Sequence, residues 1–250
     1  MELNICHLYP DILNLYGDRG NIITMKRRLE SRGISVNVDE CSIGQPLDVD
    51  KYDIFFIGGG QDFEQEVLLR DLASGKGKDI CTAVEEEKVF LAICGGYQML
   101  GQYYKTWDGV QLDFIGAINV HTIGAKERMI GNYMFTCDEL NCEIVGFENH
   151  SGKTYLGAGV KPMGKVLAGF GNNGEDGTEG ARYKNVFGTY SHGSLLPKNP
   201  KLAEAILTSM VKKLHKPVTV KFRKGFDDSC VNAVEFARMA ESCGVSAVAV

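Results

Sequence analysis

Apolar runs and helical stripes alternate along the first hundred residues. Four short runs of apolar or β-branched residues are predicted strands, at residues 3–8, 34–38, 53–57 and 89–93. Two stretches with apolar residues at helical spacing are predicted helices, at residues 20–32 and 64–72. Buried strands separated by helices are typical of a mostly parallel sheet covered on both faces. The pattern therefore predicts an α/β fold.

The pattern changes between about residues 110 and 190. Shorter strand-like pieces broken by glycine, such as MIGNYMF and KVLAGFG, indicate an antiparallel extension or edge strands on the same sheet. The polar segment GNNGEDGTEG at residues 171–180 is predicted to be a surface loop. An amphipathic helix is expected over residues 202–214, after the PKNP break.

Composition and charge narrow the class of protein. The chain of 250 residues is 44% hydrophobic and 24% charged, as in an ordinary soluble globular protein. Its net charge of −5, without a Lys/Arg cluster, disfavours nucleic acid as a partner. No apolar run approaches the ~20 residues that span a bilayer, and the N-terminus does not resemble a signal peptide. We expect a cytoplasmic protein without membrane insertion.

Cysteine and histidine usage argues against metal binding. The eight cysteines and five histidines are scattered and form no CxxC or HxxxH pattern. We therefore expect reduced thiols, no metal site and no cofactor.

One cysteine stands where a nucleophile would. In VFLAICGGYQMLG, Cys94 follows a buried strand and precedes two glycines and an apolar helical segment. Glycines allow the sharp turn that lifts a side chain above a sheet edge, and ligands of α/β sheets collect at that edge. A helix N-terminus beginning at Gly95 would favour the thiolate and hold an oxyanion. A buried, unreactive cysteine is the alternative.

Two further features could complete such a site. FFIGGGQDFEQ is a second strand that ends in glycines, and the Gly60 amide is the best candidate for another oxyanion donor. His192, in VFGTYSHGSLL, follows an apolar strand and could reach a neighbouring strand end as a base. His150, which GFENHSGKTY places in a predicted polar turn, is the second choice. Either histidine could instead be a satisfied structural side chain. Together these features fit Cys-His acyl transfer.

These motifs resemble a known family. AICGGYQMLG with a late SHG is similar to the class I glutamine amidotransferases of the CobB/CobQ branch. LYPDILNLYGDRGNI, FIGGGQDFEQ, GFENHSGKTYL and EGARYKNVFGTYSHG resemble more closely the GatD-type glutaminase subunits of lipid II isoglutaminyl synthase. The likeness covers about residues 1–214, which we take as one amidotransferase domain with a mostly parallel sheet and an antiparallel extension.

The resemblance implies a reaction and its residues. Cys94 would attack the side-chain amide of glutamine, His192 would act as base and acid, and Arg128 in KERMIGN would anchor the substrate. The ammonia would pass to a MurT-like Mur ligase, which amidates the D-glutamate of lipid II to D-isoglutamine at the inner face of the membrane. Many class I relatives carry a glutamate two residues after the histidine, whereas this chain has Ser194. We therefore expect a Cys-His dyad, with a third, acidic residue supplied by the partner.

Residues 215–250 do not fit this domain. Their pattern predicts a strand at PVTVKF, a helix over residues 230–242 and a strand at VSAVAV. KPVTVKFRKG resembles the start of a β/α unit in tRNA-dihydrouridine synthases, where Lys221 would match a lysine that contacts FMN. One unit cannot close a barrel, so flavin chemistry is not expected. A fused or chimeric reading frame and a tail that docks on the main domain both remain open.

Three other functions are weighed against the leading one. The chain could be the glutaminase of another amide-forming synthetase, such as a cobyric acid synthase. It could be a non-catalytic binding module that keeps the fold, although retention of Cys94, His192 and Arg128 together argues against this. The tail alone would suggest a tRNA-modifying flavoprotein.

Overall fold

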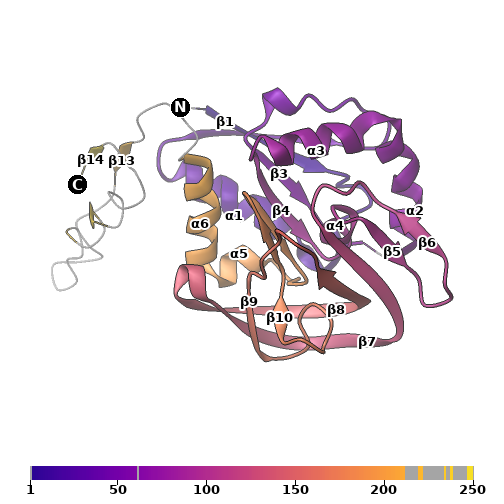
Figure 1. Ribbon diagram of the computed structural model, residues 1–250. Coiled ribbons are helices and arrows are strands. Elements are labelled where there is room, and N and C mark those ends of the chain that lie inside the picture. Colours follow the sequence, from indigo (N-terminus) through magenta and orange to yellow (C-terminus); the bar gives the residue numbers. More distant parts are fainter. Residues whose placement is uncertain are drawn as a thin grey trace.

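A six-stranded sheet forms the centre of the protein. The computed structural model describes residues 2–60, 62–211, 219–221, 234, 237–238 and 247–249. The central sheet has the strand order β11-β12-β4-β3-β1-β2 (Figure 1). Its strands are β1 (Glu2–Leu8), β2 (Ser35–Cys41), β3 (Ile54–Ile57), β4 (Val89–Ile93), β11 (Ala181–Tyr183) and β12 (Val186–Thr189). All neighbours are parallel except β11, which runs antiparallel to β12.

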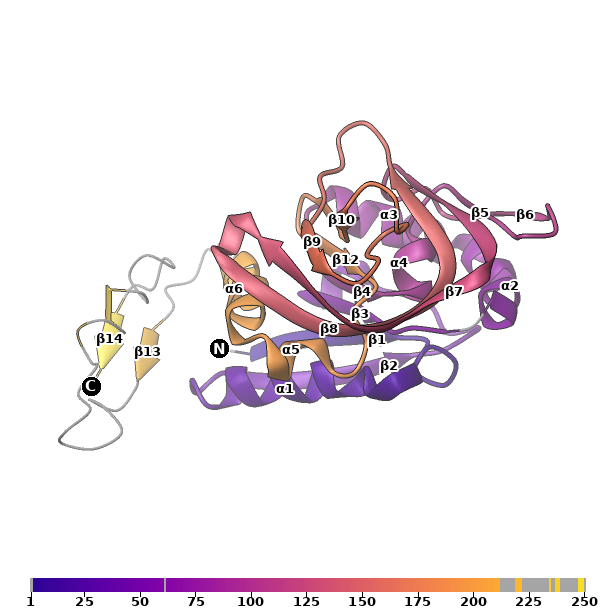
Figure 2. The same ribbon diagram turned by 90° about the horizontal axis from the view of Figure 1, so that it is seen from below.

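Helices cover both faces of this sheet. Helix α1 (Arg19–Glu30) lies on one face with α5 (Leu195–Lys198) and α6 (Pro200–Val211), and α3 (Gly77–Glu85) lies on the other (Figure 2). Helix α2 (Asp62–Asp71) connects β3 to α3 through a π-helical turn at Leu72–Lys76. Strands β3 and β4 are wholly buried, and the Phe55 and Phe90 rings stack 4.6 Å apart between them. Burial on both faces explains their uninterrupted apolar sequences.

A second sheet arches over the carboxyl edge of the first. Its long strands β7 (Val120–Cys137) and β8 (Cys142–Leu156) form an antiparallel pair that crosses the central sheet as a curved band (Figure 2). The shorter strands β5 (Tyr103–Lys105), β6 (Gln111–Asp113), β9 (Gly164–Ala168) and β10 (Thr178–Glu179) complete it. The predicted antiparallel extension is therefore mainly a sheet of its own, and only β11 joins the edge of the central sheet.

The register between β7 and β8 is interrupted once. Gly124 pairs with Gly152, but the next pair is Met129 with His150, so residues 125–128 bulge out of the ladder. A bulge of this kind bends a strand and redirects the side chains on it. Arg128 lies in the bulge, and the irregularity determines where its side chain is placed.

Sequence patterns predicted the early elements better than the late ones. The four strands and the two helices of the first hundred residues are confirmed, although α3 was not predicted. The prediction of a surface loop at 171–180 is wrong in part, because Asn172, Asn173 and Glu179 are buried. The Asn172 side chain explains this: Oδ1 accepts from the Gly180 amide at 3.0 Å, and Nδ2 donates to the Gly180 carbonyl at 2.9 Å. Side-chain hydrogen bonds thus replace a regular strand ladder inside the fold.

The C-terminal segment contains two short strands. Strands β13 (Thr219–Lys221) and β14 (Ala247–Ala249) pair in parallel, as two strands joined by a crossover would. Both lie where the sequence predicts strands. The boundary near residue 214 and most of the predicted helix between the strands lie outside the described residues. Among the described helices, none is long and apolar enough to cross a membrane.

Candidate active site

Cys94 occupies a strained corner between β4 and α4 (Gly95–Met99). Its φ of 47° and ψ of −106° are unusual for a residue with a side chain, and such strain clusters at functional sites. The Cys94 amide donates to the Thr189 carbonyl of β12 at 2.8 Å. A Cβ on Gly96 would lie 2.5 Å from Ile57 Cγ2 and 2.8 Å from the Gly58 carbonyl, so the turn needs glycine there. The expected elbow is confirmed.

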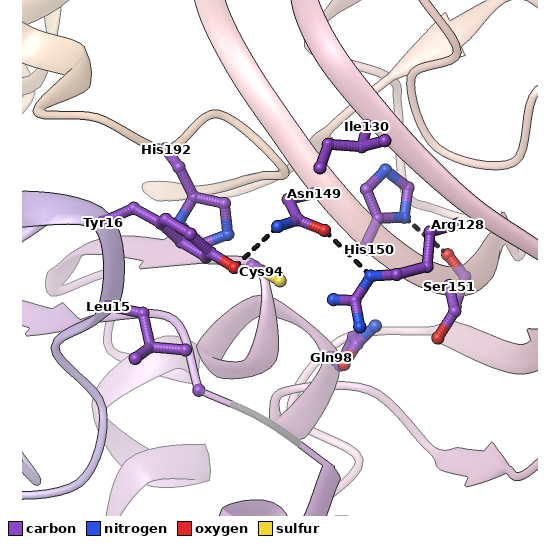
Figure 3. A pocket seen from close by; sticks show the side chains of 12 residues that line it. Leu15, Tyr16, Cys94, Gln98, Arg128, Ile130, Asn149, His150, Ser151 and His192 are labelled. Atoms are coloured by element: carbon purple, nitrogen blue, oxygen red, sulfur yellow. Dashed lines mark hydrogen bonds between the residues drawn. The ribbon is translucent and has the colours of Figure 1, made fainter.

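His192 and Cys94 meet because their strands are neighbours. Strand β12 lies beside β4, and His192 follows the end of β12. The His192 amide donates to the Phe147 carbonyl of β8 at 2.8 Å, which fixes the backbone under the second sheet. The imidazole is 1% exposed and faces the Cys94 sulfur across a cavity (Figure 3). The sequence-predicted nucleophile and base are thus brought together.

Asp18 orients the imidazole from within the same chain. Asp18 Oδ2 lies 3.1 Å from His192 Nδ1 and also accepts from the Gly59 amide at 3.0 Å. Asp18 is fully buried and directly precedes α1. The expectation that this histidine lacks an orienting carboxylate in its own chain is therefore wrong. The carboxylate comes from the loop after β1 instead of the segment after the histidine.

Close approach of two loops lets Asp18 reach His192. Ser194 Oγ donates to the Gly17 carbonyl at 2.6 Å, which ties the loop after His192 to the loop that carries Asp18. A Cβ on Gly59 would lie 2.3 Å from His192 Cε1 and 3.2 Å from Asp18 Oδ2. The second glycine of the GGG motif is therefore required by the position of the imidazole ring.

The charges at this site favour an imidazolium. An ionised carboxylate only accepts hydrogen bonds, so Nδ1 carries the proton shared with Asp18, and Nε2 faces the thiol. Among the described residues, Nε2 has no hydrogen-bond partner. Burial alone would lower the pKa of His192, but the negative charges of Cys94 and Asp18 outweigh it and raise that pKa to about 10. The surroundings of His192 thus favour its protonated form.

A cavity of about 540 Å³ opens beside the two residues. Cys94, His192, Arg128 and Gly60, which the sequence singled out, all line it. Gly95 is not one of its lining residues, and it forms the first residue of α4 directly behind the thiol. No group of His, Cys, Asp and Glu residues in the described ranges could hold a metal ion.

His150 has another environment than predicted. It lies on β8, is 3% exposed and stacks on the Tyr190 ring with centroids 3.6 Å apart. Its Nδ1 is 2.8 Å from the Gly152 carbonyl. His150 lines the wall of the cavity from the second sheet and is not in a polar turn.

Among the residues that sequence reasoning missed, three make polar contacts that shape the site: Asp18, Tyr16 and Asn149. Asp18 and Tyr16 belong to the segment YGDRG directly after the loop that follows β1. A charged residue between glycines, at the carboxyl edge of a central parallel strand, is a signal that could have found Asp18. Asn149 carries no such signal, because its role depends on the register between β7 and β8.

A buried carboxyl supports the backbone before His192. Glu179 Oε1 accepts from Thr189 Oγ1 at 2.6 Å and from the Tyr190 amide at 3.0 Å. Glu179 is fully buried, and its Oε2 has no partner among the residues described. Burial raises the pKa of Glu179 to about 7, although the two donated hydrogen bonds lower it in part. The turn that carries the base is thus anchored on a carboxyl that titrates near neutrality.

Comparisons with known proteins identify the family of this chain. The family model described as the CobB/CobQ-like glutamine amidotransferase domain matches residues 4–200. This chain belongs to that family. A second model, for dihydrouridine synthase, matches residues 187–250 and overlaps the first over residues 187–200.

Individual relatives give the same picture. The GatD subunit of the glutamine-hydrolysing lipid II isoglutaminyl synthase from Streptococcus pneumoniae is 43% identical, over 85% of this chain and 82% of its own. The corresponding subunit from Staphylococcus aureus is 42% identical, over 88% of this chain and 89% of its own. A crystal structure of a glutamine amidotransferase superposes with a TM-score of 0.59 at 16% identity, over 82% of this chain and 98% of that one. As a member of this family, the chain is a glutamine amidotransferase.

The substitution Asp18→Asn tests the orienting carboxylate. It keeps an oxygen for His192 and Gly59 but removes the charge that stabilises the imidazolium, so we expect kcat for glutamine hydrolysis to fall roughly 10²- to 10⁴-fold. KM should change little, because Asp18 does not line the cavity. Steady-state glutamate release measures both constants. The exposed Asp11, on the preceding loop, gives the control Asp11→Asn, and equal activity of the two variants would contradict the assignment.

Glu179→Gln tests the buried carboxyl through the pH dependence of stability. Because the pKa of Glu179 is about 7 in the folded protein and about 4.5 when unfolded, its favourable contribution is complete below pH 4.5 and is lost as pH rises through 7. The neutral variant lacks this loss. Its free energy of unfolding should therefore rise by on the order of 3 kcal/mol relative to wild type between pH 4.5 and 8. Urea unfolding at several pH values measures the difference. A difference independent of pH would show that Glu179 is charged in the folded protein.

Proposed function

We propose that this protein is the glutaminase subunit of a lipid II isoglutaminyl synthase. The observation that carries the proposal is the strained Cys94 facing His192, which Asp18 orients, in a cavity that also presents Arg128. The match to the two GatD subunits over more than four-fifths of their lengths supports the pathway. The substrate is L-glutamine, and the acceptor of the ammonia is the D-glutamate of lipid II.

The geometry suggests how each residue acts. Arg128 binds the α-carboxylate of glutamine, and the side-chain amide then lies next to Cys94. His192 holds the thiol proton, and the sulfur attacks the amide carbon to give a tetrahedral oxyanion. In this proposal the amides of Gly60 and Gly95 stabilise that oxygen. His192 then gives its proton to the departing nitrogen, and the carbon–nitrogen bond breaks. Ammonia leaves, and the glutamyl group remains on Cys94 as a thioester.

Water completes the cycle. His192, again neutral at Nε2, removes a proton from a water molecule that attacks the thioester. Cleavage of the carbon–sulfur bond releases glutamate and the Cys94 sulfur, and the proton taken from water stays on His192 Nε2, as at the start of the cycle. Asp18 holds the ring in one tautomer through both halves of the reaction, because its Oδ2 is fixed by the Gly59 amide.

The second subunit of the synthase is a MurT-like Mur ligase. It activates the α-carboxyl of the D-glutamate with ATP and takes the ammonia at the inner face of the membrane. Exposed apolar side chains at the cavity, Tyr16 at 46% and Ile130 at 53%, belong to a surface suited to docking a partner. Docking at this mouth would keep the ammonia from escaping into water.

Glutamate release from L-glutamine tests this proposal. The wild type, co-expressed with a MurT-like ligase, should release glutamate and convert the lipid II stem peptide to its amidated form. Cys94→Ala should lower the rates of both activities at least about 10³-fold, because no other nucleophile lies at the elbow. Mass spectrometry of the stem peptide and an enzymatic glutamate assay measure the two products.

A matched cysteine provides the control. Cys81 is half-buried on α3, and its Sγ contacts the Ile115 carbonyl at 3.3 Å, outside the cavity of Cys94. Cys81→Ala should keep both activities. Glutamate release that persists in Cys94→Ala would overturn the mechanism, and release without amidation of the stem peptide would point to another synthetase as partner.

A further inference from the structure

Three polar side chains form a bridge across the mouth of the cavity. Asn149 Nδ2 donates to the Tyr16 hydroxyl at 2.6 Å, and Arg128 Nε donates to Asn149 Oδ1 at 2.9 Å (Figure 3). Tyr16 comes from the loop after β1, Asn149 from β8 and Arg128 from the bulge in β7. The bridge therefore connects the central sheet to the second sheet on the open side of the cavity.

Hydrogen-bond chemistry fixes the direction of this bridge. The guanidinium of arginine only donates, so the amide oxygen of Asn149 must face Arg128 and its nitrogen must face Tyr16. Because Nε is occupied by Asn149, the two terminal nitrogens of Arg128 remain for a ligand. Neither makes a hydrogen bond or ion pair to another described residue. A guanidinium held in this way presents a pair of donors that matches a carboxylate.

The conformation of Tyr16 is not one that packing alone would select. Its φ of 53° and ψ of 25° lie in the left-handed region, which is costly for a bulky residue. The side chain is 46% exposed, so it gains little from burial. This conformation brings two contacts. The Tyr16 ring packs edge-on against the His192 ring with centroids 4.8 Å apart, and the Tyr16 hydroxyl accepts a hydrogen bond from Asn149. Tyr16 therefore touches the catalytic base with one end and the support of Arg128 with the other.

We propose that Tyr16 and Asn149 are positioning residues that aim the terminal nitrogens of Arg128 into the cavity, and so make the site select substrates with a free α-carboxylate. This inference rests on the proposed glutaminase function and deepens it. Recognition of the carboxylate and placement of His192 are coupled through one side chain. Glutamine within a peptide chain, which has no free α-carboxylate, is excluded for the same reason.

Two thiol reagents separate carboxylate recognition from thiol reactivity. A diazoketone analogue of glutamine carries the amino-acid head group and alkylates the nucleophile with loss of N2, whereas iodoacetamide has no carboxylate. Mass spectrometry of Cys94 gives the rate constant and the half-saturating concentration for the analogue. Tyr16→Phe removes only the hydroxyl and should raise that concentration about 3- to 10-fold. Asn149→Ala removes a hydrogen bond to a charged group and should raise it about 10- to 100-fold.

Three comparisons distinguish a positioning role from a structural one. The maximal rate of labelling by the analogue, and the rate with iodoacetamide, should stay within about twofold of wild type in both variants. The half-saturating concentration of the analogue should be about the same for the double variant as for Asn149→Ala alone, because both changes break the same chain of hydrogen bonds. Tyr155 lies on β8, as Asn149 does, and its hydroxyl donates to Glu175. The control Tyr155→Phe removes only that hydroxyl and should behave as wild type.

The outcomes separate this inference from the proposed function. Selective labelling of wild-type Cys94 by the analogue, with no change in Tyr16→Phe or Asn149→Ala, would overturn the inference and leave the function standing. If Cys94 in the variants is labelled more slowly by the analogue and by iodoacetamide to the same extent, the inference is also overturned, since the substitutions would then have distorted the pocket. A wild type that the analogue labels no better than iodoacetamide does would overturn the proposed function itself, and the inference with it.

Discussion

The hydrogen bond from the Cys94 amide to the Thr189 carbonyl joins the strand before Cys94 to the strand before His192. Because β4 and β12 are parallel neighbours, the residues after them emerge at the same edge of the sheet, and Cys94 and His192 face each other there. The same edge receives the loops after β1 and β3, which bring Asp18 and the glycine corner. Four loops from distant parts of the sequence thus converge on one thiol.

The convergence depends on small residues and on strain. Gly59 and Gly96 allow contacts that a Cβ would prevent, and Cys94 and Tyr16 adopt backbone conformations that most side chains avoid. Strained backbone conformations of this kind persist only where the surrounding structure holds them in place. Here buried hydrogen bonds do so: Glu179 anchors the turn before His192, and Ser194 anchors the turn after it. The geometry around Cys94 and His192 is therefore a property of the folded domain, in which Asp18 of the same chain contacts the imidazole.

Much of this could be predicted from local sequence, and the rest could not for identifiable reasons. The strand ends at Ile57, Ile93 and Thr189 carry clear signals, and these signals placed Gly60, Cys94 and His192 correctly at one edge. Asp18 was missed because the search for an orienting acid was confined to the segment after the histidine, whereas pairing of side chains across loops has no fixed spacing. The positions of the Asn149 and Arg128 side chains depend on a bulge in β7, where the register with β8 shifts. No short sequence motif predicts this bulge. The polar loop at 171–180 appeared exposed because composition does not show which asparagines bond to buried backbone groups.

The protonation state of His192 is the quantity on which the account depends most directly. Nitrogen NMR of the imidazole in the isolated protein, recorded from pH 5 to 11, measures it. Because the Cys94 and Asp18 charges raise the pKa of His192 to about 10, the ring should stay protonated at both nitrogens through pH 8, with the Nδ1 proton held by Asp18. In Cys94→Ala the titration should move to lower pH, since the largest charge that raises that pKa is lost. A neutral ring at pH 7.5 in the wild type, titrating near 6.5 and unchanged by Cys94→Ala, would contradict the account.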